Sequence, residues 1–364
     1  MKIAFRADAS LEMGTGHVMR CLTLAKQLSL SNHDSVFICR PHVGNLIEFI
    51  RAAGFKVISL ASPQINKPED VNHLAHGHWL GSTWQEDAKQ SIQCLNEELI
   101  DCLVVDHYAL DILWEQALNS VTHNVFVIDD LADRNHQCFA LLDQNYGRSK
   151  MDYKNLLSED CSVFIGPKYA LLRPEFSALR DESLKRRDSF ELKTILVNLG
   201  GVDQFNHTAS ILIELNDFPL PADIKIVVVL GATCPNIASV KAAAVNSPFE
   251  VEVKVGVSNM AELMLNSDLA IGAAGSTTWE RFALGLPSIL VSIASNQDAA
   301  LEALTANGHI YSINLSHLGS GLKTFFETGN TSNKLKSLSN QCRKLCDANG
   351  VQTMAKEIEA ISDW

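Results

Sequence analysis

The sequence lacks the features that mark secreted, membrane-spanning or zinc-binding proteins. Its nine cysteines are scattered, no Cys-x-x-Cys pair occurs, and Cys342 and Cys346, one helical turn apart, have no second pair of ligands beside them. This pattern favours reduced, mostly buried thiols over a disulfide framework or a metal site. No apolar run approaches the roughly 20 residues that cross a bilayer, and no secretory leader precedes the first strand-like segment. We therefore expect a cytoplasmic protein without membrane insertion.

An excess of positive charge is also missing. Lys and Arg number 30 against 42 Asp and Glu, which gives a formal net charge of −12. A field of that sign repels nucleic acid and anionic membranes, so neither is an expected partner. A phosphate-bearing ligand must then be held by local groups. No feature of the sequence indicates an obligate protein partner.

Short β-branched runs alternate with helical stretches through most of the 364 residues, a length that suits two domains of about 150–200 residues. Such alternation predicts parallel sheets covered by helices. The expected strands are 2–7, 36–39, 56–59, 102–105, 125–128 and 163–165 in the first half, and 194–198, 224–230, 250–255, 269–271 and 288–291 in the second.

These elements predict two domains, over 1–180 and 191–364. The charged segment 179–193 is expected to connect them, and the last helix could pack back on the first domain. The predicted fold class is α/β, with two Rossmann-like, doubly wound parallel sheets. Ligands of such sheets bind beyond the carboxyl ends of the strands. If the two domains face each other, the cleft between them is therefore the expected site.

The loop over 8–20 follows the first expected strand and opens a helix. Gly14 and Gly16 allow a tight turn and the close approach of a ligand. His17 falls in the first helical turn, where the helix dipole favours a neutral imidazole that can act as a base. The loop is not a dinucleotide fingerprint, because Met19 stands where the third glycine belongs. A plain tight turn with an incidental histidine is the alternative interpretation.

Two small-residue loops follow strands in the second half. Gly200 and Gly201 expose backbone N–H groups that suit a diphosphate at a helix N-terminus, although a simple turn would also explain them. Ser276 and Thr277 can cap the next helix and offer hydroxyls, and Glu280 could bind both ribose hydroxyls. A common capping arrangement of Ser or Thr before Glu is the alternative. Two such loops in one half together favour a phosphate-bearing ligand.

Three further strand ends carry polar side chains. Asn296 and Gln297 could bind sugar hydroxyls and acetamido groups, or belong to an ordinary polar loop. Asp106 ends one strand, and Asp129 with Asp130 ends another. Paired carboxylates would fit a glycosidase or a metal site, but one Asp commonly caps the turn that follows it. We favour the turn-capping interpretation.

His73, His76 and His78 form a local cluster. They lack the i, i+4 spacing of a helical metal site, and their flanks are typical of a polar loop. No other motif indicates a metal, so neither a metal nor a cofactor is predicted.

Taken in order along the chain, these motifs resemble a known family. The set comprises Gly-Thr-Gly-His17, Asp106-His-Tyr108-Ala-Leu-Asp, Ile128-Asp-Asp-Leu-Ala-Asp133, Leu142-Asp-Gln-Asn145, Tyr169-Ala-Leu-Leu-Arg173-Pro-Glu-Phe176, the Gly200-Gly201 loop, and the segments 275–280 and 296–297. The whole is similar to the UDP-2,4-diacetamido-2,4,6-trideoxy-β-L-altropyranose hydrolases of pseudaminic acid biosynthesis. Pseudaminic acid is a sugar of flagellin or other surface glycans. The second half alone also resembles the UDP-GlcNAc transferase of peptidoglycan lipid II synthesis.

The resemblance implies a GT-B architecture, a small-molecule UDP-sugar as substrate, and hydrolysis of its anomeric C–O bond with inversion at C1. By matching positions, His17 corresponds to the general base on water. Tyr108 and Asn296 match residues that line the sugar and water site. Arg173 and Glu280 match nucleotide-binding positions.

The backbone near Met260 also matches a nucleotide-binding position, although only the surrounding Ser-Asn-Met-Ala-Glu-Leu pattern guides that alignment. Three other functions stay open. A GT-B glycosyltransferase would use His17 on an acceptor hydroxyl, a non-catalytic subunit would bind a UDP-sugar and release nothing, and a UDP-sugar 2-epimerase would convert the sugar without net release of UDP.

Overall fold

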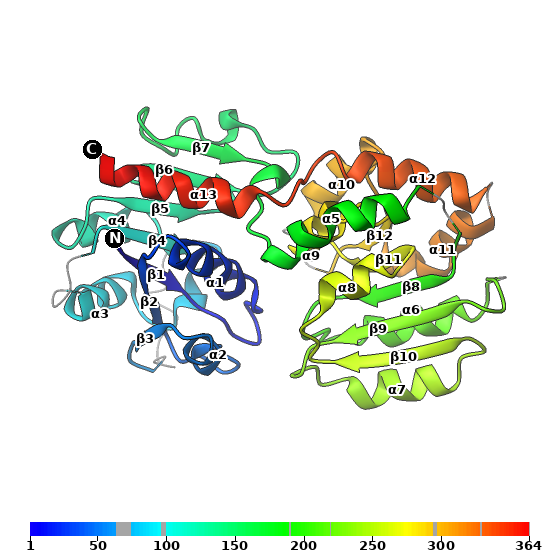
Figure 1. The fold of residues 1–364 in the computed structure, drawn as a ribbon. Helices are drawn as coiled ribbons and strands as arrows, with labels where there is room; N and C mark the ends of the chain where they lie inside the picture. Colours follow the sequence, from blue (N-terminus) through cyan, green and yellow to red (C-terminus); the bar gives the residue numbers. More distant parts are fainter. Residues whose placement is uncertain are drawn as a thin grey trace. The chain divides into compact units, whose positions relative to one another are not determined.

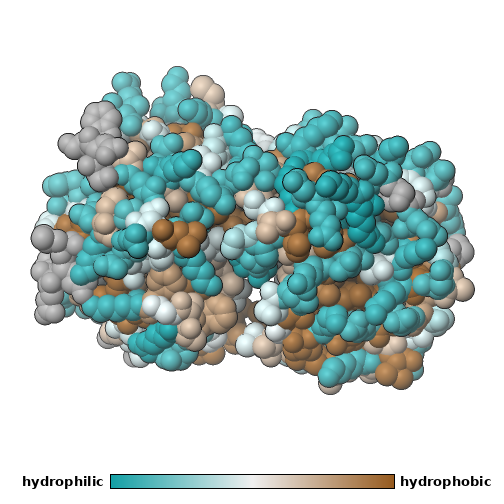
Figure 2. All heavy atoms as spheres, in the orientation of Figure 1, coloured by the Kyte–Doolittle hydropathy of each residue, from teal (hydrophilic) through white to brown (hydrophobic). Residues whose placement is uncertain are grey.

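The protein is described from a computed structural model that covers residues 1–62, 74–95, 100–188, 191–218, 220–293, 297–327 and 330–363. The chain divides into two compact units, Met1–Leu171 together with Asn349–Trp364, and Leu172–Ala348 (Figure 1). In the described parts of the chain, no helix combines the length and the apolar character needed to cross a membrane. Figure 2 shows hydrophilic residues over most of the face in view, with smaller hydrophobic areas among them.

The first unit contains, in its described residues, a seven-stranded parallel sheet with the strand order β3-β2-β1-β4-β5-β6-β7. Its strands are β1 (Lys2–Ala7), β2 (Asp34–Cys39), β3 (Lys56–Ser59), β4 (Cys102–Asp106), β5 (Val125–Ile128), β6 (Ala140–Asp143) and β7 (Ser162–Ile165). The chain winds outward in one direction from β1 and in the other from β4. Ala7 pairs with Asp106, so β1 and β4 end side by side. This topological switch point is where such sheets bind ligands.

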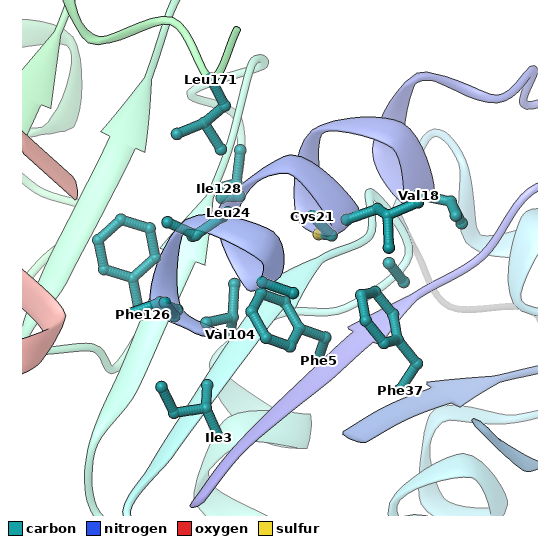
Figure 3. Close-up of a cluster of buried hydrophobic side chains, with 14 of the residues drawn as sticks. Ile3, Phe5, Val18, Cys21, Leu24, Phe37, Val104, Phe126, Ile128 and Leu171 are labelled. Atoms are coloured by element: carbon teal, nitrogen blue, oxygen red, sulfur yellow. The ribbon is translucent and has the colours of Figure 1, made fainter. Parts of the chain in front are cut away.

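Helices cover both faces of this sheet. They are α1 (Gly16–Ser29), α2 (Ile47–Ala52), α3 (Trp84–Leu95), α4 (Ile112–Ala117) and α13 (Gly350–Glu359). Apolar residues recur along α1 at helical spacing and are buried, and α1 packs against α13. Figure 3 shows Cys21 and Leu24 of α1 among Phe5 and Val104 of the sheet. A second core, which includes Trp114 of α4, fills the opposite face.

The second unit repeats this plan. Its described strands are β8 (Thr194–Asn198), β9 (Lys225–Leu230), β10 (Glu250–Val255), β11 (Leu269–Ala273), β12 (Ser288–Val291) and β13 (Tyr311–Ile313). Its helices are α5 (Pro174–Arg186), α6 (His207–Leu215), α7 (Ile237–Val245), α8 (Met260–Leu265), α9 (Thr277–Ala283), α10 (Asp298–Ala306), α11 (Leu318–Glu327) and α12 (Thr331–Cys342). The strand order β10-β9-β8-β11-β12-β13 puts the switch point between β8 and β11, where Asn198 pairs with Gly272.

The predicted fold class is confirmed, because both units are parallel sheets with interleaved helices. Each strand expected from the sequence is present within two residues of its expected bounds. The sequence did not predict β6 or β13, which have only four and three residues. The shortness of β13 leaves little periodic signal, but it does not explain the omission of β6, because β5 also has four residues and was expected.

The expected connection over 179–193 is wrong for its described residues up to 188. Its first part is the end of α5 rather than an irregular linker. Ser183 and Arg187 are buried, and they donate hydrogen bonds to backbone carbonyls, among them that of Leu284 for both side chains. The polar groups that made the segment look solvent-exposed therefore fix the helix to the second unit.

Candidate functional site

His17 stands at the switch point of the first sheet. The glycine loop turns at Gly14, whose φ is +76°, and its N–H donates to the carbonyl of Ser10. Helix α1 then begins at Gly16 and holds His17 in its first turn. Because β1 and β4 end together, the His17 Nδ1 atom lies 2.6 Å from Oδ1 of Asp106, 89 residues away in sequence. Both side chains are buried.

Arg20 holds the other side of Asp106. It follows His17 by one helical turn, so both side chains share one face of α1. Its Nε and Nη2 atoms donate to the two oxygens of Asp106, each at 2.6 Å. Its Nη1 lies 2.7 Å from Oδ2 of Asp130, which also accepts a 2.7 Å hydrogen bond from the hydroxyl of Tyr108. The five side chains form one polar network, in which all but the partly buried Asp130 are buried.

The charge of Asp106 determines which nitrogen of His17 carries a hydrogen. Burial by itself raises the pKa of this carboxyl, but the charge of Arg20 and the hydrogen bonds from Arg20 and His17 hold it well below its ordinary value. A carboxylate only accepts hydrogen bonds, so Nδ1 donates, and Nε2 is the acceptor in the neutral ring. The pair can therefore act as a general base on a water or hydroxyl that reaches Nε2.

Aromatic rings surround His17. The ring of Tyr108 lies 4.6 Å from it at a right angle, and Trp79 stacks on Tyr108 with ring centres 5.6 Å apart. Trp79 and His76 come from the 3-10 helix η2 (Gly77–Leu80) and the residue before it. The interpretation of this segment as a polar loop is therefore wrong in its described part. His73 lies outside the described residues.

The carboxylates at the two polar strand ends have different roles. Asp129 accepts backbone hydrogen bonds from Leu131 at 3.3 Å and Ala132 at 2.9 Å, which confirms the turn-capping interpretation for this residue. Asp106 and Asp130 instead belong to the network around Arg20. Among the described residues, no group of three or more His, Cys, Asp or Glu side chains is placed to hold a metal ion.

In the second unit, the Gly200–Gly201 loop joins β8 to α6. Gly200 has a φ of +93°, a backbone angle that residues other than glycine rarely adopt. Asp203 accepts hydrogen bonds from the backbone N–H groups of His207 and Thr208, each at 2.9 Å. The first turn of α6 is thus capped by the chain itself. A diphosphate would have to use the N–H groups of the glycine loop rather than those of this helix.

Arg281 ties the ends of β8 and β11 together. Its buried guanidinium donates to the carbonyls of Ala273 at 3.2 Å and Asn198 at 3.4 Å, and to the hydroxyl of Thr277 at 3.0 Å. A Cβ atom on Gly272 would lie 2.4 Å from Nη2 of Arg281. Burial lowers the pKa of Arg281 to about 10, so it stays charged at neutral pH.

Glu280 faces Arg173 within the second unit. Their closest atoms, Oε1 of Glu280 and Nη2 of Arg173, are 3.3 Å apart, and Arg173 also lies 3.0 Å from Glu175. Burial raises the pKa of Glu280 above its ordinary value, and the charge of Arg173 opposes that shift. The second Glu280 oxygen remains able to accept from a hydroxyl.

The other predicted residues of the second unit also follow strands. Met260 is the first residue of α8. Ser276 occupies the N-cap position of α9 without a side-chain cap, so the capping alternative is wrong for it. Gln297 precedes α10 and accepts a 3.2 Å hydrogen bond from the backbone of its own loop. Asn296 lies outside the described residues.

Sequence reasoning missed three residues that the structure brings to these sites, and it missed the contact that a fourth residue makes. Arg20 carried a usable signal, because it shares a helix face with His17. Asp106 was noted, but its contact with His17 depends on the pairing of β1 with β4. Trp79 and Arg281 gave no signal in the sequence, since one lies in a four-residue 3-10 helix and the other on the buried face of a short helix.

Comparison with known proteins addresses the fold first. No family model matches the chain. A crystal structure of MurG from Acinetobacter baumannii superposes with a TM-score of 0.72 at 15% identity, over 98% of this chain and 99% of that one. The GT-B class expected from the resemblance is thereby confirmed for the fold.

The resemblance to the hydrolases is also confirmed. The UDP-2,4-diacetamido-2,4,6-trideoxy-β-L-altropyranose hydrolase of Campylobacter jejuni is 27% identical over 85% of this chain and 98% of its own length. An uncharacterised protein of Methanocaldococcus jannaschii is also 27% identical, over 80% of this chain. The match spans only 55% of that longer protein.

Proposed function

We propose that the protein is a cytoplasmic hydrolase that cleaves the anomeric C–O bond of UDP-2,4-diacetamido-2,4,6-trideoxy-β-L-altropyranose in pseudaminic acid biosynthesis. The products are UDP and 2,4-diacetamido-2,4,6-trideoxy-L-altropyranose, with inversion at C1. The observation that carries the proposal is the buried His17–Asp106 pair, 2.6 Å apart, at the switch point of the first sheet. The similarity to the Campylobacter jejuni hydrolase over most of both chains supports the choice of substrate.

The base in this mechanism is Nε2 of His17. It takes a proton from a water molecule whose oxygen forms the new bond to C1, while the bond from C1 to the diphosphate oxygen breaks and its electron pair leaves with UDP. Asp106 stabilises the resulting imidazolium, and Arg20 keeps Asp106 ionised. Attack from the face opposite the leaving group inverts C1. Such a base contributes about 10²–10⁴-fold to the rate.

The tyrosine in the same network has a positioning role. The hydroxyl of Tyr108 donates to Asp130 at 2.7 Å, and its ring lies 4.6 Å from that of His17. Its lone pairs can accept a hydrogen from the sugar or the water. Asn296, matched by resemblance alone, is proposed to line the same sugar and water site.

Nucleotide binding is proposed for the second unit. The N–H groups of Gly200, Gly201 and Ser276 stabilise the departing diphosphate. Glu280, held by Arg173, accepts hydrogens from the ribose. The remaining proposed contacts are the glycine loop at Gly14 and Gly16, the backbone near Met260, the hydroxyl of Thr277 and the amide of Gln297.

Turnover is proposed to need no divalent metal, because UDP is a good leaving group and its charge has donors in the second unit. Activity should therefore persist in excess chelator. Loss of activity there, with recovery on adding Mg²⁺ or Mn²⁺, would contradict this part of the proposal.

The decisive experiment is NMR of the purified protein with this UDP-sugar, following release of UDP and the first-formed anomer of the free sugar. Release without any acceptor and with inverted configuration is expected. The His17→Asn variant should lose most turnover while it still binds UDP. Near-normal turnover in that variant would remove His17 from the mechanism.

A glycosyltransferase is the second candidate, because the fold superposes on MurG over nearly the whole chain. The same base would then act on an acceptor hydroxyl. UDP release that depends strictly on an added acceptor would favour the transferase. Tight binding of the UDP-sugar with no release under either condition would instead indicate a binding subunit.

A further inference from the structure

The segment 74–81 has no part in the mechanism above, yet it is held firmly beside His17. Leu80, in η2, is fully buried in the core that lies on the α3 and α4 face of the first sheet. The segment turns at Gly81, whose φ is +67°. Arg40 donates to the next residue, Ser82, at 3.3 Å. The buried Leu80 side chain and the hydrogen bond from Arg40 to Ser82 therefore hold this segment against the first unit.

His76 and Trp79 of this segment lie beside His17 and contact Tyr108, which follows β4; we define these three residues as the aromatic cluster. The ring centres of Trp79 and Tyr108 are 5.6 Å apart with planes only 20° from parallel. His76 lies 4.4 Å from Trp79 and 5.5 Å from Tyr108. Each ring therefore contacts the other two, and Trp79 is also 6.4 Å from the His17 ring.

The glycine loop fixes the edge of the indole. Nε1 of Trp79 donates to Oε1 of Glu12 at 3.1 Å, and His78 lies 2.8 Å from the same oxygen. The hydrogen bond from His78 lowers the pKa of the exposed Glu12 carboxyl, so Glu12 stays an acceptor at neutral pH. The polar edge of Trp79 is thus occupied, while the ring itself remains half-buried.

The base is almost fully buried. Only 8% of the His17 side chain is exposed, and its ring neighbours are Tyr108 and Trp79. A group that reaches Nε2 of His17 therefore passes close to these rings. Aromatic faces favour the C–H faces and methyl groups of a ligand over its hydroxyls.

We propose that Trp79, supported by His76 and Glu12, is a specificity-determining residue that packs against the apolar face of the sugar whose anomeric carbon faces His17. The inference rests on the proposed function and names the sugar class it selects: hexoses with a deoxy C6 methyl group and acetamido substituents. A sugar with hydroxyl groups at both C4 and C6 buries less apolar surface against the indole.

Binding is measured by calorimetry in the His17→Asn background, where the sugar nucleotide is not consumed. Trp79→Leu should weaken binding of the UDP-diacetamido-trideoxy sugar about tenfold, the size of one good aromatic contact. The dissociation constant of UDP alone should not change. Trp79→Phe should recover most of the loss. Trp84→Phe, a tryptophan five positions away and outside the aromatic cluster, is the matched control.

Substrate selectivity distinguishes a direct sugar contact from a purely structural role of Trp79, because a structural role would affect both substrates equally. In the otherwise wild-type protein, Trp79→Leu should lower the ratio of kcat/KM for this sugar over UDP-GlcNAc about tenfold. Equal affinities in Trp79→Leu and its parent, or an equal loss for UDP alone, would overturn the inference. If the wild-type protein binds the sugar through Trp79 but hydrolyses nothing, the proposed function fails and the contact stands.

Discussion

At the scale of single residues, the carboxylate of Asp106 decides what the imidazole of His17 can do. Arg20 engages both oxygens of Asp106, so the carboxylate cannot rotate freely. His17 donates to the same group, which fixes its ring orientation and leaves Nε2 as the acceptor. An isolated imidazole at this position could present either nitrogen.

We predict that Asp106→Asn lowers kcat for UDP release by about 10²–10⁴-fold, the range of general base catalysis. The amide cannot stabilise the imidazolium, and it permits the wrong tautomer of His17. It also leaves Arg20 with a weaker buried partner, which costs up to about 3–5 kcal/mol, so folding is checked by thermal unfolding. UDP affinity should be unchanged. The exposed Asp160→Asn is the control, and wild-type turnover of a folded Asp106→Asn protein would contradict the mechanism.

A second residue-scale effect concerns stability rather than catalysis. Burial and the nearby charge of Asp130 raise the pKa of Asp143 from 3.8 to about 7. The hydroxyl of Tyr153 lies 2.9 Å from both Asp143 and Asp129. The native protein therefore keeps a proton on Asp143 that the unfolded chain releases near pH 4.

More protons are then bound in the native state than in the unfolded state between about pH 4 and 7, so this group's contribution to the free energy of unfolding falls as the pH rises through that window. Asp143→Asn, which stays neutral, should flatten this part of the stability profile in urea unfolding from pH 4 to 8. The exposed Asp160→Asn should not. An unchanged profile in Asp143→Asn would show that Asp143 does not hold the proton.

His17 was predictable from the sequence because its glycine loop follows a strand and opens a helix. Its partner was not, since the contact with Asp106 requires the register of two strands far apart in the chain. Trp79 was not predictable either. Its ring contacts join three separate segments, and no local pattern encodes them.

At the scale of elements, the Gly200–Gly201 loop depends on a glycine in a neighbouring strand end. A Cβ atom on Gly231, which directly follows β9, would lie 2.1 Å from the carbonyl oxygen of Gly201. We predict that Gly231→Ala destabilises the second unit by roughly 1–3 kcal/mol and weakens UDP binding. The measurements are urea unfolding and calorimetric titration with UDP.

Gly275→Ala is the matched control for stability, because a Cβ atom there meets nothing within 4 Å. It should leave the free energy of unfolding within about 0.5 kcal/mol of the parent. Unchanged UDP affinity in Gly231→Ala would mean that the glycine loop does not contact the diphosphate.

Most elements were predictable because buried parallel strands read as apolar runs, as in β5 and β9. The exceptions have physical causes. Helix α5 looked like a linker because Arg186 and Arg187 are charged, but their guanidinium groups bind backbone carbonyls of the second unit. Helix propensity is a local property of the sequence, so it cannot predict that a charged side chain will donate hydrogen bonds to carbonyls far away in the chain.

At the scale of the whole molecule, the chain enters the second unit after Leu171 and returns to the first at Asn349. Helix α13 then completes the core of the first unit, with Met354 fully buried. The two parts of the first unit that flank this insertion lie close together, because a Cβ atom on Gly350 would lie 2.3 Å from the carbonyl carbon of Tyr169. The first unit is therefore interrupted by the second.

We predict that Met354→Ala destabilises the first unit by about 2–5 kcal/mol, the usual cost of such a cavity. Scanning calorimetry should show that the first unit unfolds at a lower temperature in this variant. The unfolding transition whose midpoint temperature is raised by UDP should be unchanged. Met151→Ala, in the same unit but 70% exposed, should have little effect. If only the UDP-sensitive transition shifted, α13 would not stabilise the core of the first unit, and the prediction would be wrong.

This interruption sets the order in which the ribosome can deliver finished parts. Domains usually fold as they emerge, the N-terminal one first. Here residues 172–348 are all synthesised before the segment that closes the first unit. The half with the candidate nucleotide residues is complete while the half that holds His17 still lacks α13. A nascent chain is therefore expected to acquire the proposed UDP affinity before the unit that holds His17 reaches full stability.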